Sequence, residues 1–191
     1  MERVEKLMQL AEEAVETENY EKAMKYYRQA ARQGNALAMW EIGLLYADID
    51  YEGYDTDKAI EWYRKSIEAG NSDAMVTLGN AYRDGEGVEC DEEEAAVWYR
   101  KAAEAGCTSG CVALGYAYEH GHGVEMNWKE AIACFKKVAD VEVDAMYHLG
   151  EIYENAAYAL GGDIDQALSC YREAAKWFDE RATEKLRKLE G

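Results

Sequence analysis

No stretch of this 191-residue chain approaches the roughly 18 consecutive apolar residues that a membrane-spanning helix needs. The N-terminal segment mixes charged and apolar side chains and lacks the uninterrupted apolar core of a secretion signal. Basic residues are scarce, because 21 Lys and Arg stand against 39 Asp and Glu, which gives a net charge of −18. This charge disfavours nucleic acids and anionic lipids and favours basic partners. We therefore expect a cytoplasmic protein that binds neither nucleic acid nor membrane.

Signatures of catalysis and of cofactor binding are also missing. The segments GEGV and GHGV lack the Lys-Ser or Lys-Thr pair of a phosphate-binding loop, and no Ser or Cys nucleophile stands in phase with a histidine. His120 and His122 lie beside acidic residues, but without the ligand spacing of a recognised zinc site, so a solvated loop is expected there. His148 lies among helical residues and is expected to be structural. The sequence predicts a protein that is not an enzyme and holds no cofactor.

The chain does contain a repeat of 36 residues. One alanine recurs at that interval: Ala23, Ala59, Ala95, Ala131 and Ala167. Four positions before each alanine stands an Asn or an Asp: Asn19, Asp55, Asp91, Asn127 and Asp163. A period of this length is typical of a solenoid built from stacked supersecondary units. Hydrophobic residues make up 49% of the sequence, which is enough for such an array to fold.

Each repeat is expected to contain two helices. In the second helix the Asn or Asp fits an N-cap, and Glu94, Glu130 and Gln166 would complete capping boxes. These helices are expected to end at Gly34, Gly70 and Gly106. The first helix carries glycine at one fixed phase: Gly43, Gly79, Gly115 and Gly150. Because a glycine inside a helix costs up to about 1 kcal/mol, we expect the second helix to approach the first closely there.

These residues resemble the Sel-one-like repeat family, which is related to the tetratricopeptide repeat. The family pattern is Ala, Leu-Gly and Tyr, then a Gly-x-Gly-Val connector, then Asp, Ala, Trp-Tyr, Ala-Ala and a closing Gly. It is met in full from Ala74 to Gly106 and nearly in full from Gly110 to Ala139. The second and fifth repeats have other connectors, so their loops are expected to differ. The resemblance implies an all-α, right-handed superhelical solenoid of about five helix-turn-helix repeats.

We expect a single repeat domain over residues 1–191. It would comprise a tetratricopeptide-like hairpin at 1–35, four repeats at 36–71, 72–107, 108–142 and 143–178, and a capping helix at 179–191. In that helix Ala182 and Leu186 repeat the phase of Ala145 and Leu149 among charged residues. A polar terminal helix is what an open-ended stack requires.

If the tetratricopeptide geometry applies, a fixed set of positions on each first helix lines a concave groove. The predicted groove residues are Leu37, Trp40, Leu44, Val76, Asn80, Arg83, Val112, Tyr116, Glu119, Tyr147 and Glu151. Their apolar and acidic character suits a peptide segment or protein with aliphatic anchors and Lys or Arg flanks. The alternative for Trp40 and Tyr116 is packing against a neighbouring helix or a second copy. We predict a non-catalytic scaffold or adaptor, and favour a monomer.

The five cysteines bear on the alternatives to a scaffold. Their number is odd and they follow no framework spacing, which favours reduced thiols. A secreted, cysteine-rich branch of the same family is linked to β-lactam binding and hydrolysis and carries cysteines eight residues apart. Here Cys111 matches the second member of such a pair, but Ala103 stands where the first belongs. A β-lactam hydrolase is therefore disfavoured, and a self-associating or designed repeat module without a natural ligand is the third possibility.

Overall fold

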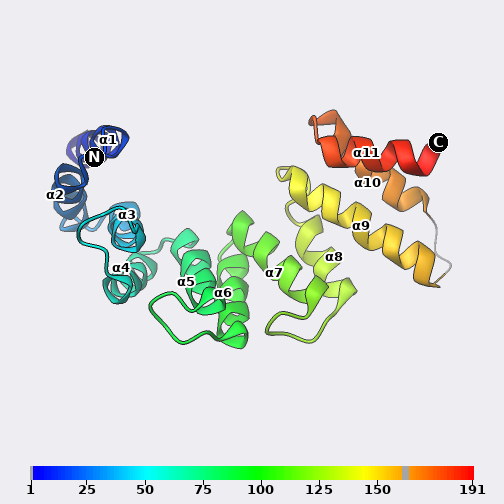
Figure 1. Ribbon diagram of the computed structural model, residues 1–191, viewed down its shortest axis with the longest axis horizontal. Coiled ribbons are helices and arrows are strands. Elements are labelled where there is room, and N and C mark those ends of the chain that lie inside the picture. The colour runs from blue at the N-terminus through cyan, green and yellow to red at the C-terminus, as the bar shows by residue number, and fades with distance from the viewer. Residues whose placement is uncertain (1, 161–163) are drawn as a thin grey trace. The chain divides into compact units, whose positions relative to one another are not determined.

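A computed structural model describes residues 2–160 and 164–191 of the chain. Over these two ranges it contains eleven α-helices and no strand, which confirms the predicted all-α class (Figure 1). The helices are α1 (Glu2–Glu16), α2 (Tyr20–Ala31), α3 (Ala36–Ala47), α4 (Thr56–Glu68), α5 (Asp73–Asp84), α6 (Glu92–Glu104), α7 (Thr108–His120), α8 (Trp128–Lys136), α9 (Val143–Leu160), α10 (Asp165–Lys176) and α11 (Glu180–Glu190). Among the described residues, no helix has the length and apolar character needed to span a membrane.

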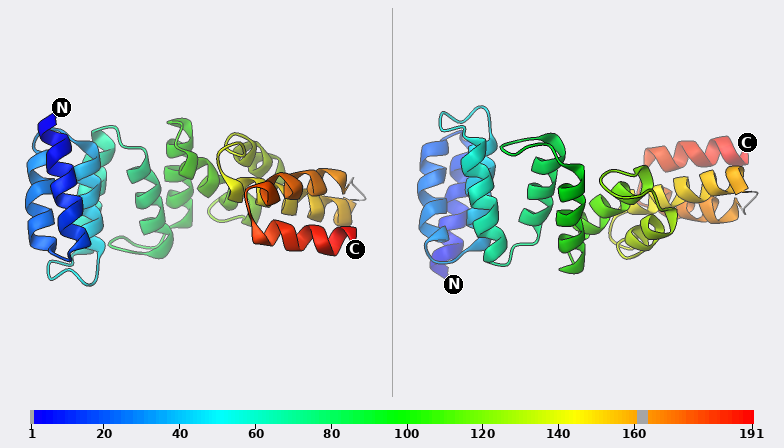
Figure 2. Two further views of the ribbon diagram at one scale, coloured as in Figure 1. Left: turned by 90° about the horizontal axis from the view of Figure 1, so that it is seen from above. Right: turned by 90° about the horizontal axis from the view of Figure 1, so that it is seen from below.

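The helices form two compact units, unit 1 (residues 1–105) with α1 to α6 and unit 2 (residues 106–191) with α7 to α11. Within each unit consecutive helices pack as hairpins, and each hairpin contacts the next (Figure 2). The five hairpins correspond to the five expected repeats. The helix α11 packs on α10 and buries Ala182 completely, as expected of a capping helix. The right-handed superhelix and the single domain stay predictions.

The predicted N-caps start the second helices of the repeats. The side chain of Asp55 accepts a hydrogen bond from the Lys58 N–H at 3.0 Å. The same bond to the residue three positions on is made by Asn19, Asp91 and Asn127, whereas Asp163 lies outside the described residues. The backbone N–H of Asp91 donates to the Tyr82 carbonyl at 2.8 Å rather than to the side chain of Glu94. The N–H of Asn127 likewise donates to a tyrosine carbonyl of the preceding helix, so the capping-box prediction was wrong for Glu94 and Glu130.

The helical glycines lie where the two helices of a hairpin approach each other most closely. A Cβ placed on Gly79 would lie 2.5 Å from Cε1 of Tyr99 and 3.2 Å from the carbonyl oxygen of Ala95. Equivalent close contacts with an aromatic ring of the second helix occur at Gly43, Gly115 and Gly150. The expected packing role of these glycines is confirmed. The glycines expected after the second helices, Gly34, Gly70 and Gly106, have left-handed φ values of 82°, 95° and 83°.

In unit 1, tyrosines on α3 and α5 connect their hairpins to the preceding ones. The guanidinium of Arg28 donates to the Tyr46 hydroxyl at 2.6 Å, and that of Arg64 donates to the Tyr82 hydroxyl at 2.9 Å. In the fifth repeat the connector expected from the sequence is largely helical, because α9 continues to Leu160. The predicted groove residues lie on α3, α5, α7 and α9, the first helices of the second to fifth hairpins.

Candidate functional site

We name the predicted groove positions on the first helices the A-face. In unit 1 the A-face contains Leu37, Trp40 and Leu44 on α3, spaced three and four residues apart, so that they project from one side of the helix. Leu37 is 44% exposed, whereas Trp40 and Leu44 are half-buried against the core. The indole N–H of Trp40 donates to the Thr77 hydroxyl of α5 at 2.8 Å. Trp40 thus fixes the contact between two repeats.

Beside Leu44 the A-face of unit 1 opens into a cleft of about 300 Å³. The residues that α3 and α4 contribute to its wall are mainly apolar, and those that α5 and the following loop contribute are mainly polar. The lining residues are Leu44, Ala47, Thr56, Ala59, Ile60, Tyr63, Thr77, Asn80, Ala81, Arg83, Asp84 and Glu86. Three of the predicted groove residues, Leu44, Asn80 and Arg83, therefore lie around one cavity.

The polar residues of the cleft are held by neighbours. The hydroxyl of Tyr99 donates to Oδ1 of Asn80 at 2.8 Å, which orients the Asn80 amide. The guanidinium of Arg83 donates twice to the Asp84 carboxylate, at 2.8 and 2.7 Å, and these hydrogen bonds lower the pKa of Asp84. Val76, the remaining predicted residue on α5, is half-buried. The cleft therefore combines an apolar wall with an oriented amide and a paired guanidinium.

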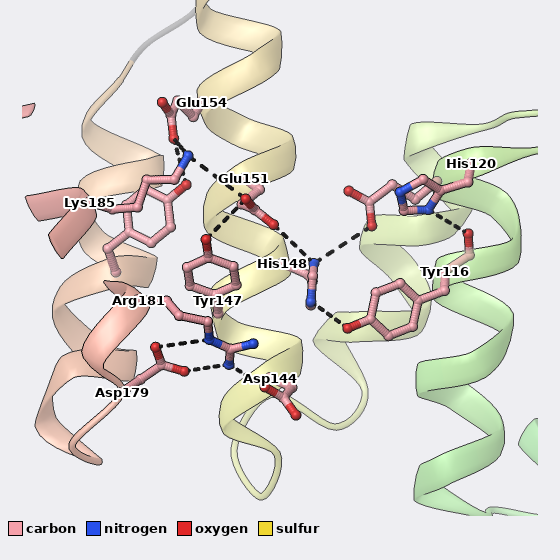
Figure 3. A network of polar contacts seen from close by, with 12 residues as sticks. Tyr116, His120, Asp144, Tyr147, His148, Glu151, Glu154, Asp179, Arg181 and Lys185 are labelled. Carbon is pink, nitrogen blue, oxygen red and sulfur yellow. Dashed lines mark hydrogen bonds and ion pairs between the residues drawn. The ribbon is translucent and has the colours of Figure 1, made fainter. Parts of the chain in front are cut away.

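In unit 2 the A-face residues meet around a histidine (Figure 3). The hydroxyl of Tyr116 on α7 hydrogen bonds Nε2 of His148 on α9, and the two rings lie 4.5 Å apart. The hydroxyl of Tyr147 donates to Oε1 of Glu151 at 3.1 Å. Tyr147 is buried rather than open, and burial is the main reason its pKa rises to about 12. Val112, also predicted, is half-buried on α7.

Two cations of the capping helix, Arg181 and Lys185, also belong to this network, and they are not among the residues predicted from the sequence. The ammonium of Lys185 lies 2.9 Å from Oε2 of Glu154 and 3.8 Å from Oε1 of Glu151. Arg181 pairs with Asp144 and, at 2.6 Å, with Asp179 (Figure 3). Arg181 precedes Ala182 as Asp144 precedes Ala145, so the two share a phase, but the repeat period does not indicate that their side chains meet. Much of the acidic rim expected to receive a basic partner is thus paired within unit 2.

The ionisable groups of the unit 2 A-face respond to burial in different ways. Burial opposes the ionisation of Glu154, but hydrogen bonds from Tyr171 and Lys185 outweigh it and lower the pKa of Glu154. Burial raises the pKa of Glu119, and it lowers the pKa of His148. Burial therefore disfavours the carboxylate form of Glu119 and the imidazolium form of His148.

The remaining candidate groups are His120, His122 and the five cysteines. Nδ1 of His120 lies 3.1 Å from the Tyr116 carbonyl oxygen, and the rings of His120 and His122 stack at 5.6 Å. In the described ranges no group of three His, Cys, Asp or Glu side chains is placed to hold a metal ion. All five cysteines lie in those ranges and none forms a disulfide. Cys107 caps α7, where its sulfur accepts from the Gly110 N–H at 3.4 Å.

A family model and solved structures both show similarity to Sel1 repeat proteins. The family model "Sel1 repeat" matches residues 12–35, 36–71, 72–107, 108–140 and 143–176. A search among curated proteins gave no match. A Sel1 repeat protein from Oxalobacter formigenes has 28% identity and a TM-score of 0.79, over 97% of this chain and 78% of that one.

Two further solved structures are similar. Helicobacter pylori cysteine rich protein B has 27% identity and a TM-score of 0.53, over 65% of this chain and 90% of that one. The protein c5321, described as a protective antigen of uropathogenic Escherichia coli with an SLR fold, has 31% identity and a TM-score of 0.77 over 88% of this chain. This chain spans only 36% of c5321. Because the family model covers most of its length, the chain belongs to the Sel1 repeat family.

Proposed function

We propose that this protein is a non-catalytic, monomeric scaffold of the cytoplasm that binds a peptide segment or partner protein on its A-face. Sel1 repeat proteins generally serve as scaffolds for protein interactions, which supports the class of function. The single observation that carries the proposal is the unit 1 cleft beside Leu44, with Asn80 and Arg83 on its wall. A partner with an aliphatic side chain for the cleft and polar backbone groups for Asn80 fits this chemistry.

Unit 1 also supports the basic character proposed for the partner. The carboxyl of Glu41 on α3 is half-buried, and burial together with the nearby charge of Glu12 raises its pKa. A Lys or Arg of a partner would offset both negative charges, and the net charge of −18 would speed its approach. In unit 2, by contrast, Arg181 and Lys185 already pair with the carboxylates of α9. We therefore assign the main binding role to the A-face of unit 1.

The proposal is tested by affinity capture with a double variant, Leu37→Asp with Arg83→Glu, because both side chains are exposed on the A-face. The matched control is Val97→Asp with Lys25→Glu, which makes the same chemical changes on exposed positions of the second helices. Circular dichroism must show that both variants stay folded. A protein captured by wild type and control, but lost from the A-face variant, supports the proposal. Equal capture by all three proteins contradicts it.

The other two possibilities have direct assays. The five cysteines form no disulfide, so the pairing that marks the cysteine-rich branch has no support here. We expect no hydrolysis of the chromogenic β-lactam nitrocefin above the rate of buffer alone. Static light scattering should give the monomer mass of 21.6 kDa across a hundredfold range of concentration. A mass that rises with concentration would favour self-association.

A further inference from the structure

His148 on α9 lies at the contact between the fourth and fifth repeats (Figure 3). Its ring is surrounded by the aromatic rings of Tyr116, Phe135 and Tyr147, with centroids 4.5, 5.7 and 5.4 Å away. The hydroxyl of Tyr116 hydrogen bonds its Nε2 atom, so one of the two ring nitrogens is satisfied. The other nitrogen, Nδ1, faces carboxylates from both helices.

Nδ1 of His148 lies 3.2 Å from Oε2 of Glu151 and 3.9 Å from Oε2 of Glu119. Both Nδ1 and Oε2 of Glu119 are buried, and in the part of the chain that the structure describes neither makes a hydrogen bond. Glu119 also stands in the last turn of α7, where the helix dipole disfavours negative charge. Two buried polar atoms on neighbouring helices thus face each other with no bond between them, a costly arrangement.

We infer that Glu119 and His148 form a proton-operated contact between α7 and α9. When the ring proton sits on Nε2 and is donated to the Tyr116 oxygen, Nδ1 is a bare acceptor that faces a carboxylate, and uptake of one proton supplies the donor that this contact lacks. The proton comes from solvent and belongs to the pair. If Glu119 holds it, the carboxylic O–H donates to Nδ1 of His148, and the ring's Nε2–H donates to the Tyr116 oxygen. If His148 holds it, the imidazolium Nδ1–H lies between two carboxylates, with Oε2 of Glu151 at 3.2 Å and Oε2 of Glu119 at 3.9 Å. Either form adds one positive charge to the A-face of unit 2.

The charged surroundings of the pair come from three helices. They are Glu119 and His120 on α7, Asp144 and Glu151 on α9, and Arg181 on α11, together with the phenols of Tyr116 and Tyr147. The pKa values of both phenols are raised, mainly by burial, so the two tyrosines stay neutral below about pH 9. The carboxylates of Asp144 and Glu151 favour proton uptake by His148, whereas Arg181 and His120 oppose it.

The sign of the pH dependence differs for the two members of the pair. The pKa of Glu119 is raised, so its contribution to stability is present at low pH and is lost as pH rises through its folded pKa. The pKa of His148 is lowered, so its contribution is present above about pH 6.5 and is lost as pH falls through its folded pKa. The raised pKa of Glu119 and the lowered pKa of His148 both favour a state in which the pair holds one proton. We expect the pair to take up this proton at a pH between the ordinary pKa values of Glu and His.

The test replaces Glu119 with Gln, which has nearly the same shape but cannot ionise. At pH 8 the Glu119→Gln variant should melt about 2–4 °C above wild type, because a buried negative charge beside Glu151 is removed. At pH 5 the difference should vanish or reverse, since the wild-type pair has taken up its proton. The control is Glu125→Gln, which alters an exposed connector residue and should show the same small difference from wild type at both pH values.

A spectroscopic readout separates this contact from a purely structural role for Glu119. Nuclear magnetic resonance of the imidazole nitrogens, with the His148 signals assigned separately, follows the titration of His148 alone. Removing the facing anion in Glu119→Gln should lower the titration midpoint of His148 by about one pH unit, whereas Glu125→Gln should leave it unchanged. The inference requires both results. A difference in melting temperature that is the same at pH 5 and pH 8, or a His148 midpoint that does not move, overturns it, whether or not the A-face binds a partner.

Discussion

The substitution Gly79→Ala, which adds a methyl group, tests how closely the two helices of a hairpin pack. In an ordinary helix the change from Gly to Ala stabilises by up to about 1 kcal/mol. Here the new Cβ would lie 2.5 Å from Cε1 of Tyr99, well inside the normal carbon–carbon contact distance of roughly 3.5–4.0 Å. The ring has little room to move, because Tyr99 is buried and its hydroxyl is bound to Asn80 at 2.8 Å. Overpacking of this kind costs about 1–3 kcal/mol.

The two effects together predict that Gly79→Ala lowers the free energy of unfolding by about 1 kcal/mol, although the same change favours the helix. Urea denaturation followed by circular dichroism measures this difference. The control repeats the change in a Tyr99→Leu background, where the ring is gone and Gly79→Ala should stabilise by up to about 1 kcal/mol. Equal stabilisation by Gly79→Ala in both backgrounds would refute the assignment of this glycine to helix packing.

Three further predictions follow from the caps and the cysteines. Asp91→Ala should cost about 1 kcal/mol in urea denaturation, because its side chain accepts from the Glu94 N–H at 2.9 Å, whereas exposed Glu92→Ala should be nearly neutral. The hydrogen bond from Arg181 lowers the pKa of Asp179, so the stability it adds is present above about pH 4 and is lost as pH falls through the folded pKa. Asp179→Asn should therefore lower the melting temperature at pH 7 and flatten its decline below pH 4; an unchanged acid decline would count against this ion pair. Titration of the denatured, unreduced protein with a thiol reagent should find five thiols, and three or fewer would indicate a disulfide.

Much of the architecture could be predicted from the sequence, because helix caps and helix-packing glycines depend on residues at short, fixed spacings. An Asn or Asp four positions before the repeated alanine predicts the start of a helix, because its side-chain oxygen accepts a hydrogen bond from a backbone N–H of the first turn. A glycine at a fixed helical phase, repeated opposite an aromatic residue, predicts close packing, and Gly79 with Tyr99 shows that contact. The capping boxes predicted at Asp91 and Asn127 were wrong, because the backbone N–H of each residue donates to a tyrosine carbonyl of the preceding helix instead.

The A-face could be predicted only in part from the sequence. The repeat period placed Leu44 and Asn80 on one side of their helices, but it gave no measure of the cleft that they line. It also gave Tyr147 as a groove residue, whereas packing buries that ring. Periodicity assigns a residue to a face, while burial depends on how far apart the neighbouring helices lie.

The sequence by itself determined the helical repeat, its caps and its packing glycines, because these depend on residues within one hairpin at fixed spacing. Only the tertiary structure decided which charges meet across hairpins. Lys185 reaches Glu154 from 31 positions away, and Nδ1 of His148 faces Glu119 of another helix without a hydrogen bond. Such contacts depend on interhelical distances of a few ångströms and on the loss of water between side chains, and neither quantity is encoded in the repeat period.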